Sequence, residues 1–131
     1  MITGTTRVVS WIGRLLAGGI LAQTLYFKFT ASPESVYIFS RLGIEPWGRV
    51  GTGVLELVSV LLLLYPKTPA LGSVLACGLM GGAIFSHLTR LGIEVQGDHG
   101  LLFKLAVVTL FASLTVLVIN RRDLPLIGSR L

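Results

Sequence analysis

Six polar side chains of this sequence lie close to the ends of long apolar segments, where they could meet in one polar pocket. They are Gln23, Lys28, Arg49, Glu56, His87 and Lys104. A carboxylate, an imidazole and cations in one place can bind the polar head of a ligand or transfer protons. An ionisable side chain inside a membrane is costly unless it is paired or hydrated, so each of these residues needs a physical explanation.

Glu56 is the most informative of the six, because it interrupts the apolar stretch GVLELVSVLLLL. At the standard helical rise it lies about 12 Å along its segment, too deep for a short side chain to reach water. We expect it to face the protein interior and to be paired, hydrogen-bonded or protonated. The expected partners are Gln23, Arg49, His87 and Lys104. The alternative to a functional carboxylate is a structural hydrogen bond between helices.

The remaining candidates also have simpler explanations. Lys28, Arg49 and Lys104 could extend to lipid headgroups, as long cationic side chains do near helix ends. His87 is better explained as a hydrogen-bonding residue than as a metal ligand, because no second His or Cys lies at ligand spacing. We therefore predict no metal site. Arg14 is expected either to extend to the membrane surface or to cap a neighbouring helix.

Composition places the chain in a membrane. Of its 131 residues, 53% are hydrophobic and 13% are charged, against about 25% charged in a typical soluble domain. The mean hydropathy is +0.82. The net charge of +5 comes from cations that are scattered and flank apolar runs, which favours a membrane protein over a nucleic-acid-binding protein. The single Cys77 excludes an internal disulfide.

Four apolar runs predict four transmembrane helices, since about 20 mainly apolar residues cross the hydrocarbon core. The runs are Val8–Phe29, Trp47–Tyr65, Pro69–Leu88 and Leu101–Ile119. The first contains Arg14 and is too long for the apolar core of a signal peptide. We expect an all-α protein, a four-transmembrane-helix bundle forming one domain over residues 1–131. A short interfacial helix over residues 33–42 is also predicted, with Ser32 as N-cap and Pro33 in its first position.

A repeat flanks the outer loops: RLGIEPWGRVG begins at Arg41 and RLGIEVQGDHG begins at Arg90, with seven identities in eleven positions. Glycine adopts the left-handed conformation cheaply after a helix, and an apolar residue that follows can pack back on the last turn. We predict positive φ at Gly43 and Gly92. Duplication of a helical hairpin is an open alternative; a repeated catalytic site is disfavoured.

The RLGIE repeat also predicts how the chain enters and leaves the two loops. Ile44 should pack back on Phe39, and Ile93 on Leu88. The next helices should restart with Pro46 in a first turn and Asp98 as an N-cap.

Charge predicts the orientation. An even number of spans places both termini and the short turn at residues 66–68 on one side. That side holds Arg7, Lys67, Arg121, Arg122 and Arg130. Positive residues favour the cytoplasmic side, so we expect both termini in the cytoplasm and the protein in a bacterial inner membrane. Gly78 and Gly82 form a GxxxG pattern that serves either the bundle interior or a homo-oligomer.

The motifs also resemble, in order and spacing, those of the DoxX-like family of small four-helix membrane proteins. The resemblance covers nearly the whole chain. It rests on LYFKF with Lys28, SPES followed by RLG, GVLELVSVLLLL with Glu56, LMGGAIFSHL with His87, and GLLFKLA. It implies the four-helix membrane fold. Family members are linked to quinone-associated sulfur oxidation, membrane oxidoreductase complexes and assembly or chaperone roles, and many have no established activity.

Three functions follow as hypotheses. The preferred one is a non-catalytic subunit or assembly factor of a redox-associated membrane complex, with a membrane protein as partner. The second is a quinone-interacting component, in which Glu56 and His87 handle protons beside the quinone. The third is a binder or transporter of a small lipophilic or anionic molecule. Independent redox catalysis is disfavoured by the single cysteine and by the absence of haem, flavin and iron–sulfur motifs.

Overall fold

The computed structural model describes residues 3–125 and 128–130. Its four long helices are α1 (Gly4–Phe29), α3 (Trp47–Leu64), α4 (Pro69–Ser86) and α5 (Leu101–Asn120), and the short α2 (Pro33–Arg41) joins α1 to α3. The chain continues from α4 into a π-helical turn, η1 (His87–Leu91), and from α5 into the 3₁₀ turns η2 (Arg121–Asp123) and η3 (Gly128–Arg130). The predicted all-α bundle with a short helix between the first two spans is confirmed.

The first helix begins four residues earlier than predicted, at Gly4 instead of Val8. The cause is local: the side chain of Thr3 accepts a hydrogen bond from the backbone N–H of Thr6 and caps the helix. Ser32 caps α2 in the same way, through the N–H of Ser35, and Pro33 occupies its first turn as predicted.

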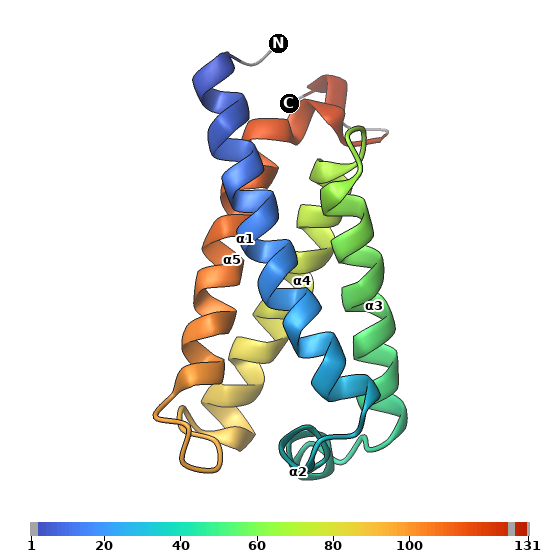
Figure 1. Ribbon diagram of the computed structural model, residues 1–131, viewed down its shortest axis with the longest axis vertical. Coiled ribbons are helices and arrows are strands. Elements are labelled where there is room, and N and C mark those ends of the chain that lie inside the picture. Colours follow the sequence, from blue (N-terminus) through green and yellow to red (C-terminus); the bar gives the residue numbers. More distant parts are fainter. Residues whose placement is uncertain (1–2, 126–127, 131) are drawn as a thin grey trace.

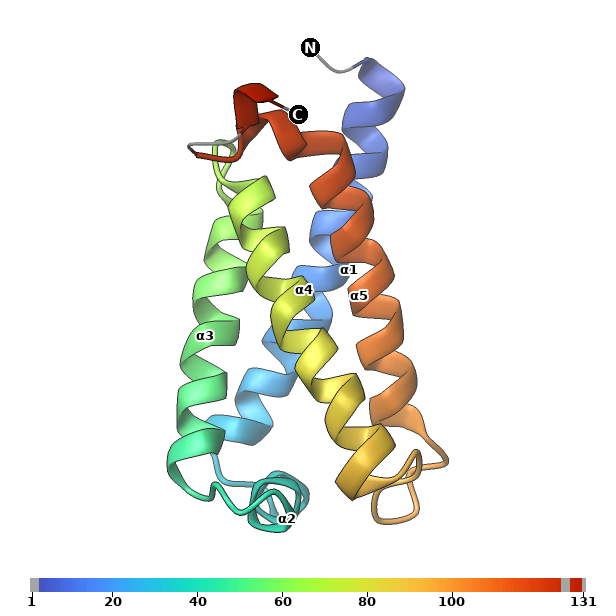
Figure 2. The same cartoon turned by 180° about the vertical axis from the view of Figure 1, so that it is seen from behind.

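Each long helix packs against two neighbours, so that α1 and α4 are diagonal to each other, as are α3 and α5. The beginning of α1 and the end of α5 lie at one end of the bundle, and α2 lies at the other (Figure 1). Near the termini α1 lies beside α5; toward α2 it leans to α3, while α4 leans to α5 (Figures 1 and 2). The bundle therefore widens toward the end that α2 covers.

The outer surfaces of the four long helices are apolar. Ile12, Leu61 and Val118 are each about 60% exposed, and the four helices are long and apolar enough to cross a membrane. Exposed leucine, isoleucine and valine at this density are unfavourable in water but suit contact with acyl chains. We conclude that these surfaces contact the lipid bilayer.

Glycines allow close contact near the termini. A methyl group added at Gly13 of α1 would lie 2.9 Å from the side chain of Val116 on α5, and one at Gly72 of α4 would lie 2.7 Å from the backbone nitrogen of Leu63 on α3. The Ser59 hydroxyl also donates a hydrogen bond to the Gly72 carbonyl. Small residues let helix backbones approach closely in a membrane, so these contacts hold the closed end of the bundle together.

Arg14 is a buried cation that caps a neighbouring helix, one of the two roles predicted for it. It is 4% exposed, and its guanidinium donates hydrogen bonds to the carbonyls of Leu63 and Tyr65 at the end of α3. It also lies 3.6 Å from the centroid of the Trp11 ring. The negative end of the α3 dipole and the indole face both favour a cation there.

Both repeat glycines have the predicted positive φ, 78° at Gly43 and 80° at Gly92. In the first copy, the N–H of Ile44 bonds to the carbonyl of Phe39 and that of Gly43 to the carbonyl of Ser40. These two bonds define a Schellman motif.

The second copy ends its helix differently. Gly92 has ψ 168°, so the chain leaves in an extended direction, and Leu88 and Ile93 are both largely exposed. Their predicted contact is therefore not part of the core. The identical residues RLGIE therefore do not impose identical exits from the two helices.

The predicted restart signals are wrong in detail. Pro46 is the N-cap residue of α3 and lies outside its first turn. Gly100, with φ 78°, is the N-cap residue of α5, while Asp98 accepts hydrogen bonds from the N–H groups of Val95, Gly100 and Leu102. Asp98 therefore holds the loop together and also caps α5, although it lies two residues before the N-cap residue Gly100.

Gly72→Ala should lower the free energy of unfolding by about 1–3 kcal/mol, because the added methyl group would overlap the backbone of α3. Gly19→Ala is the matched control, since a methyl group there would meet no atom within 4 Å; it should change stability by about 1 kcal/mol or less. Unfolding in mixed micelles measures both. Equal effects of the two substitutions would contradict this packing of α3 against α4.

Candidate functional site

A cavity of about 360 Å³ lies in the wider half of the bundle. All four long helices and α2 contribute to its walls, which are mainly aliphatic and aromatic. The polar side chains that line it are Thr24, Lys28, Glu34, Ser35, Thr52, Glu56, Ser86 and His87. A mostly apolar cavity with a few convergent polar groups is the usual form of a small-molecule site.

Glu56 faces this cavity and is paired, as predicted. It is 2% exposed; its Oε1 lies 3.0 Å from Nζ of Lys28, and its Oε2 accepts a hydrogen bond of 2.7 Å from Oγ1 of Thr24. Neither partner was among the four expected ones. Thr24 and Lys28 are four residues apart on α1 and therefore share the face that points at α3, from which the long lysine side chain reaches back to the carboxylate.

The lysine keeps hydrogen-bonding capacity for a ligand. An ammonium group has three N–H donors, and Glu56 is the partner found for it within residues 3–125 and 128–130. The Lys28 side chain is 15% exposed and lines the cavity. Its remaining donors can therefore bind an oxygen atom of a molecule in the cavity.

His87 contributes an acceptor to the same cavity. Its Nδ1 lies 2.9 Å from the carbonyl oxygen of Gly92. A carbonyl can only accept, so Nδ1 carries the hydrogen, and Nε2 can accept a hydrogen bond when the ring is neutral. The ring is fixed further by an edge-to-face contact with Phe103, with centroids 5.7 Å apart. His87 is thus held in one tautomer by the loop that follows it.

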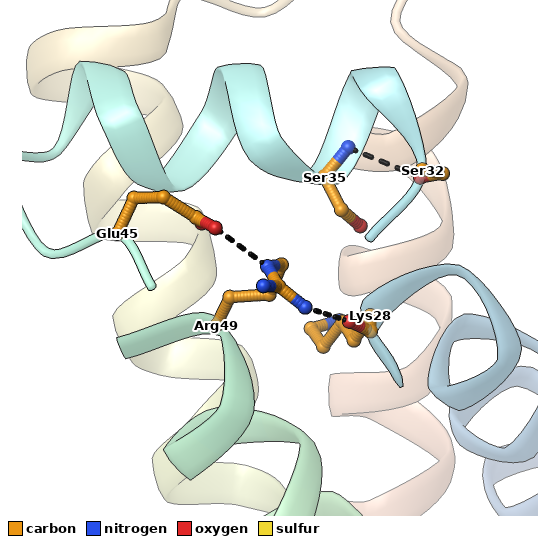
Figure 3. A network of polar contacts seen from close by, with 5 residues as sticks. All are labelled: Lys28, Ser32, Ser35, Glu45 and Arg49. Carbon is orange, nitrogen blue, oxygen red and sulfur yellow. Dashed lines mark hydrogen bonds and ion pairs between the residues drawn. The ribbon is translucent and has the colours of Figure 1, made fainter. Parts of the chain in front are cut away.

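Arg49 lies behind the site. Its Nε donates to Oε1 of Glu45 at 2.8 Å, and its Nη1 donates to the backbone carbonyl of Lys28, which places the guanidinium between the two (Figure 3). Arg49 is 8% exposed and does not line the cavity. Because it caps the end of α1, it positions Lys28 instead of binding a ligand itself.

Gln23 and Lys104, the other two predicted site residues, are exposed and lie outside the cavity lining. Gln23 is five residues from Lys28, which places it about 140° around the same helix. The prediction missed five polar liners: Thr24, Glu34, Ser35, Thr52 and Ser86. The spacing along the helices could have predicted two of them. Thr24 precedes Lys28 by four residues and Thr52 precedes Glu56 by four, so each threonine shares a helix face with a predicted site residue.

The pKa values of Glu34 and Asp98, two acids at the α2 end, are shifted in opposite directions. Burial, and then the negative charge of Asp98, raise the pKa of Glu34. Burial also acts to raise the pKa of Asp98, but its three backbone hydrogen bonds and the nearby His87 outweigh this, and the pKa of Asp98 is lowered. Of these two acids, Glu34 is therefore the one that is more easily neutralised. Among the described residues, no three His, Cys, Asp or Glu side chains come together as a metal site would require.

Removing one partner of the Lys28–Glu56 pair should be costly. Glu56→Leu leaves a buried ammonium without its counter-charge and should lower the free energy of unfolding by about 3–5 kcal/mol. The double variant Lys28→Leu/Glu56→Leu should recover most of that loss, because no unpaired charge remains. Unfolding in mixed micelles measures the double-mutant cycle. Additive losses would show that the two side chains do not interact.

The comparison with known families agrees with this architecture. The sequence profile of the DoxX-like family matches residues 12–118. No curated protein and no solved structure matches the chain significantly. The matched region includes the four long helices from Ile12 of α1 to Val118 of α5, and with them the cavity and its ion pair. The chain is an integral membrane protein and belongs to the DoxX-like family.

Proposed function

We propose that this protein binds a small lipophilic molecule with a neutral, oxygen-bearing head in the cavity. The observation that carries the proposal is the buried Lys28–Glu56 pair at the wall of a largely apolar cavity of about 360 Å³. Ligand sites usually have volumes of about 300–1,000 Å³, so the cavity suits a small ring or a short chain.

The charges of the lining favour a neutral head. Lys28 is already paired with Glu56, and Glu34 is a further acid in the lining. An anion would therefore meet no net positive charge. A carbonyl or hydroxyl oxygen can accept from Lys28, and a hydroxyl can also donate to Nε2 of His87. This chemistry supports the lipophilic ligand of the third hypothesis and disfavours an anionic one.

A quinone meets these requirements, since its carbonyl oxygens accept and its reduced form also donates. The quinone-interacting function therefore remains a second candidate, carried by the pairing of a donor, Lys28, with an acceptor, His87, in one cavity. The role of non-catalytic subunit or assembly factor stays a prediction from the sequence. A partner protein that co-purifies in stoichiometric amount from native membranes would support it.

A photoreactive dodecanol analogue that carries a diazirine can test the proposal with the protein in lipid nanodiscs. We expect cross-links to cavity-lining residues, with dodecanol and a short-chain benzoquinone competing better than dodecanoate. Lys28→Met should reduce labelling about tenfold, the effect of losing one hydrogen bond to a charged group. Lys104→Met is the matched control and should leave labelling unchanged, because Lys104 is exposed outside the cavity.

Stability must be separated from binding in this experiment. If Lys28→Met fails to fold, Lys28→Met/Glu56→Gln removes both charges and keeps the volume of the acid. Glu56→Gln alone keeps the shape of the side chain, and its amide oxygen can still accept from Thr24, so this variant should fold and keep Lys28 available to the ligand. Labelling that is spread over the lipid-facing surface, or equally strong in Lys28→Met and Lys104→Met, would contradict the proposal.

We also propose that both termini lie in the cytoplasm of a bacterial cell, with α2 and the cavity on the opposite side of the inner membrane. The support is the positive charge of the terminal side of the chain. In a Cys77→Ala background, Gln96→Cys should react with an impermeant maleimide added outside, and Lys67→Cys only after lysis, since both positions are exposed at opposite ends. The reverse pattern would contradict this orientation.

A further inference from the structure

Two glycines of α4 form an open edge of the cavity. Gly78 and Gly82 line the cavity and are also exposed on the outside of the bundle. A methyl group added at either would meet no atom within 4 Å outside its own turn of helix. They lie in the second half of α4, where it diverges from α3 (Figure 2). Within the described residues, no other helix comes within 4 Å of a methyl group at either glycine, so the GxxxG pattern does not make the close contact expected of it in the bundle interior.

This open edge lies at the depth of the ion pair. Gly78 precedes the end of α4 by eight residues, about 12 Å, and Glu56 follows the start of α3 by nine residues, about 13 Å. Both of these helix ends lie at the α2 end of the bundle (Figure 2). In a membrane the glycines would therefore face acyl chains beside the polar part of the cavity.

His87 offers a molecule in the cavity a further polar contact. It is 5% exposed and lines the cavity, and its Nδ1 is bound to the carbonyl of Gly92. The other ring nitrogen, Nε2, has no hydrogen bond within the described part of the chain and can accept from a ligand hydroxyl when the ring is neutral.

The aqueous side of the cavity is covered. Ser35, Ile38 and Phe39 of α2 line it, and the side chains of Ser35 and Phe39 are buried. The two glycines have no side chains of their own to obstruct a passing molecule, and the space at their Cβ positions is open. A lipophilic molecule concentrates in the bilayer and avoids water, so the side of the cavity that faces lipid is also the side where the ligand is abundant.

We infer that Gly78 and Gly82 form a lateral portal through which the ligand passes between the bilayer and the cavity. This inference rests on the proposed function and gives its ligand a source, the lipid phase. The two glycines act on the rate of exchange, whereas Lys28 and His87 act on affinity.

Exchange of the diazirine dodecanol analogue in nanodiscs tests the portal. Uptake is followed by flash photolysis at increasing times after mixing, and release by a chase with unlabelled dodecanol. Gly78→Leu/Gly82→Leu should slow both about tenfold, with little change in the dissociation constant. Gly81→Leu is the matched control: Gly81 is exposed, has open space around it and does not line the cavity, so its rates should equal those of the wild type.

A reversible block of the portal tests the same inference in case the leucine variants misfold. In a Cys77→Ala background, Gly82→Cys is coupled through a disulfide to a bulky lipophilic thiol, and a reductant then removes it. Exchange should slow on coupling and recover on reduction, and Gly81→Cys should do neither.

The outcomes separate the two proposals. If Gly78→Leu/Gly82→Leu leaves the uptake and release rates unchanged while the ligand still binds, the portal is overturned and the proposed function stands. The same conclusion holds if this double substitution abolishes a homodimer without changing either rate. A large loss of affinity with unchanged rates would make the glycines part of the binding wall and would also overturn the portal. Absence of cavity labelling in the wild type would overturn the proposed function and the portal with it.

Discussion

A polar group inside the hydrocarbon region must find its partner within the protein, and this constraint fixes how α1 and α3 lie against each other. Arg14 in the first half of α1 binds the last carbonyls of α3, and Arg49 near the start of α3 binds a carbonyl at the end of α1. The two contacts are reciprocal, as an antiparallel pair allows. Between them the Lys28–Glu56 pair joins the same two helices. Each of these three cations therefore has a partner on the opposite helix.

The cavity follows from where the helices can and cannot approach. Near the termini, Gly13 and Gly72 bring α1 to α5 and α3 to α4, and Asn120 donates a hydrogen bond of 2.9 Å to Ser10. Toward α2, α1 packs instead on α3, where Gly53 accommodates the ring of Phe29. The change of neighbours leaves space between the diagonal helices α1 and α4, and the ion pair occupies the wall of that space. Close packing at one end and the cavity at the other are two results of the same crossing pattern.

Much of this arrangement could be read from the sequence. The four spans follow from apolar length, α2 from Ser32 and Pro33, and the inward orientation of Glu56 from the cost of exposing it to lipid. The partner of Glu56 could not be identified, because that choice depends on how α1 is rotated about its axis. Gln23 and Thr24 are adjacent in sequence, yet one is exposed and the other binds the carboxylate.

The two RLGIE copies show a second limit of sequence reading. The same five residues end one helix in a Schellman motif and the other in a π-helical turn followed by an extended glycine. One difference lies just before the two copies: the carbonyl of Gly92 receives the His87 ring, whereas the first copy has Ile38 at the corresponding position. Glycine could be predicted to take positive φ at both sites, but its ψ depends on what its own carbonyl binds.

The crossing pattern also has a mechanical consequence. The four helices are held together at one end and diverge toward the other, so that α1 and α3 form one arm and α4 and α5 form a second arm. An 18-residue helix such as α4 is about 27 Å long. One degree of rotation at the fastened end therefore moves the far end by about 0.5 Å. A tilt of a few degrees between the two arms would therefore change the width of the open end by about 1–2 Å, and it would leave the arginine contacts inside the first arm intact.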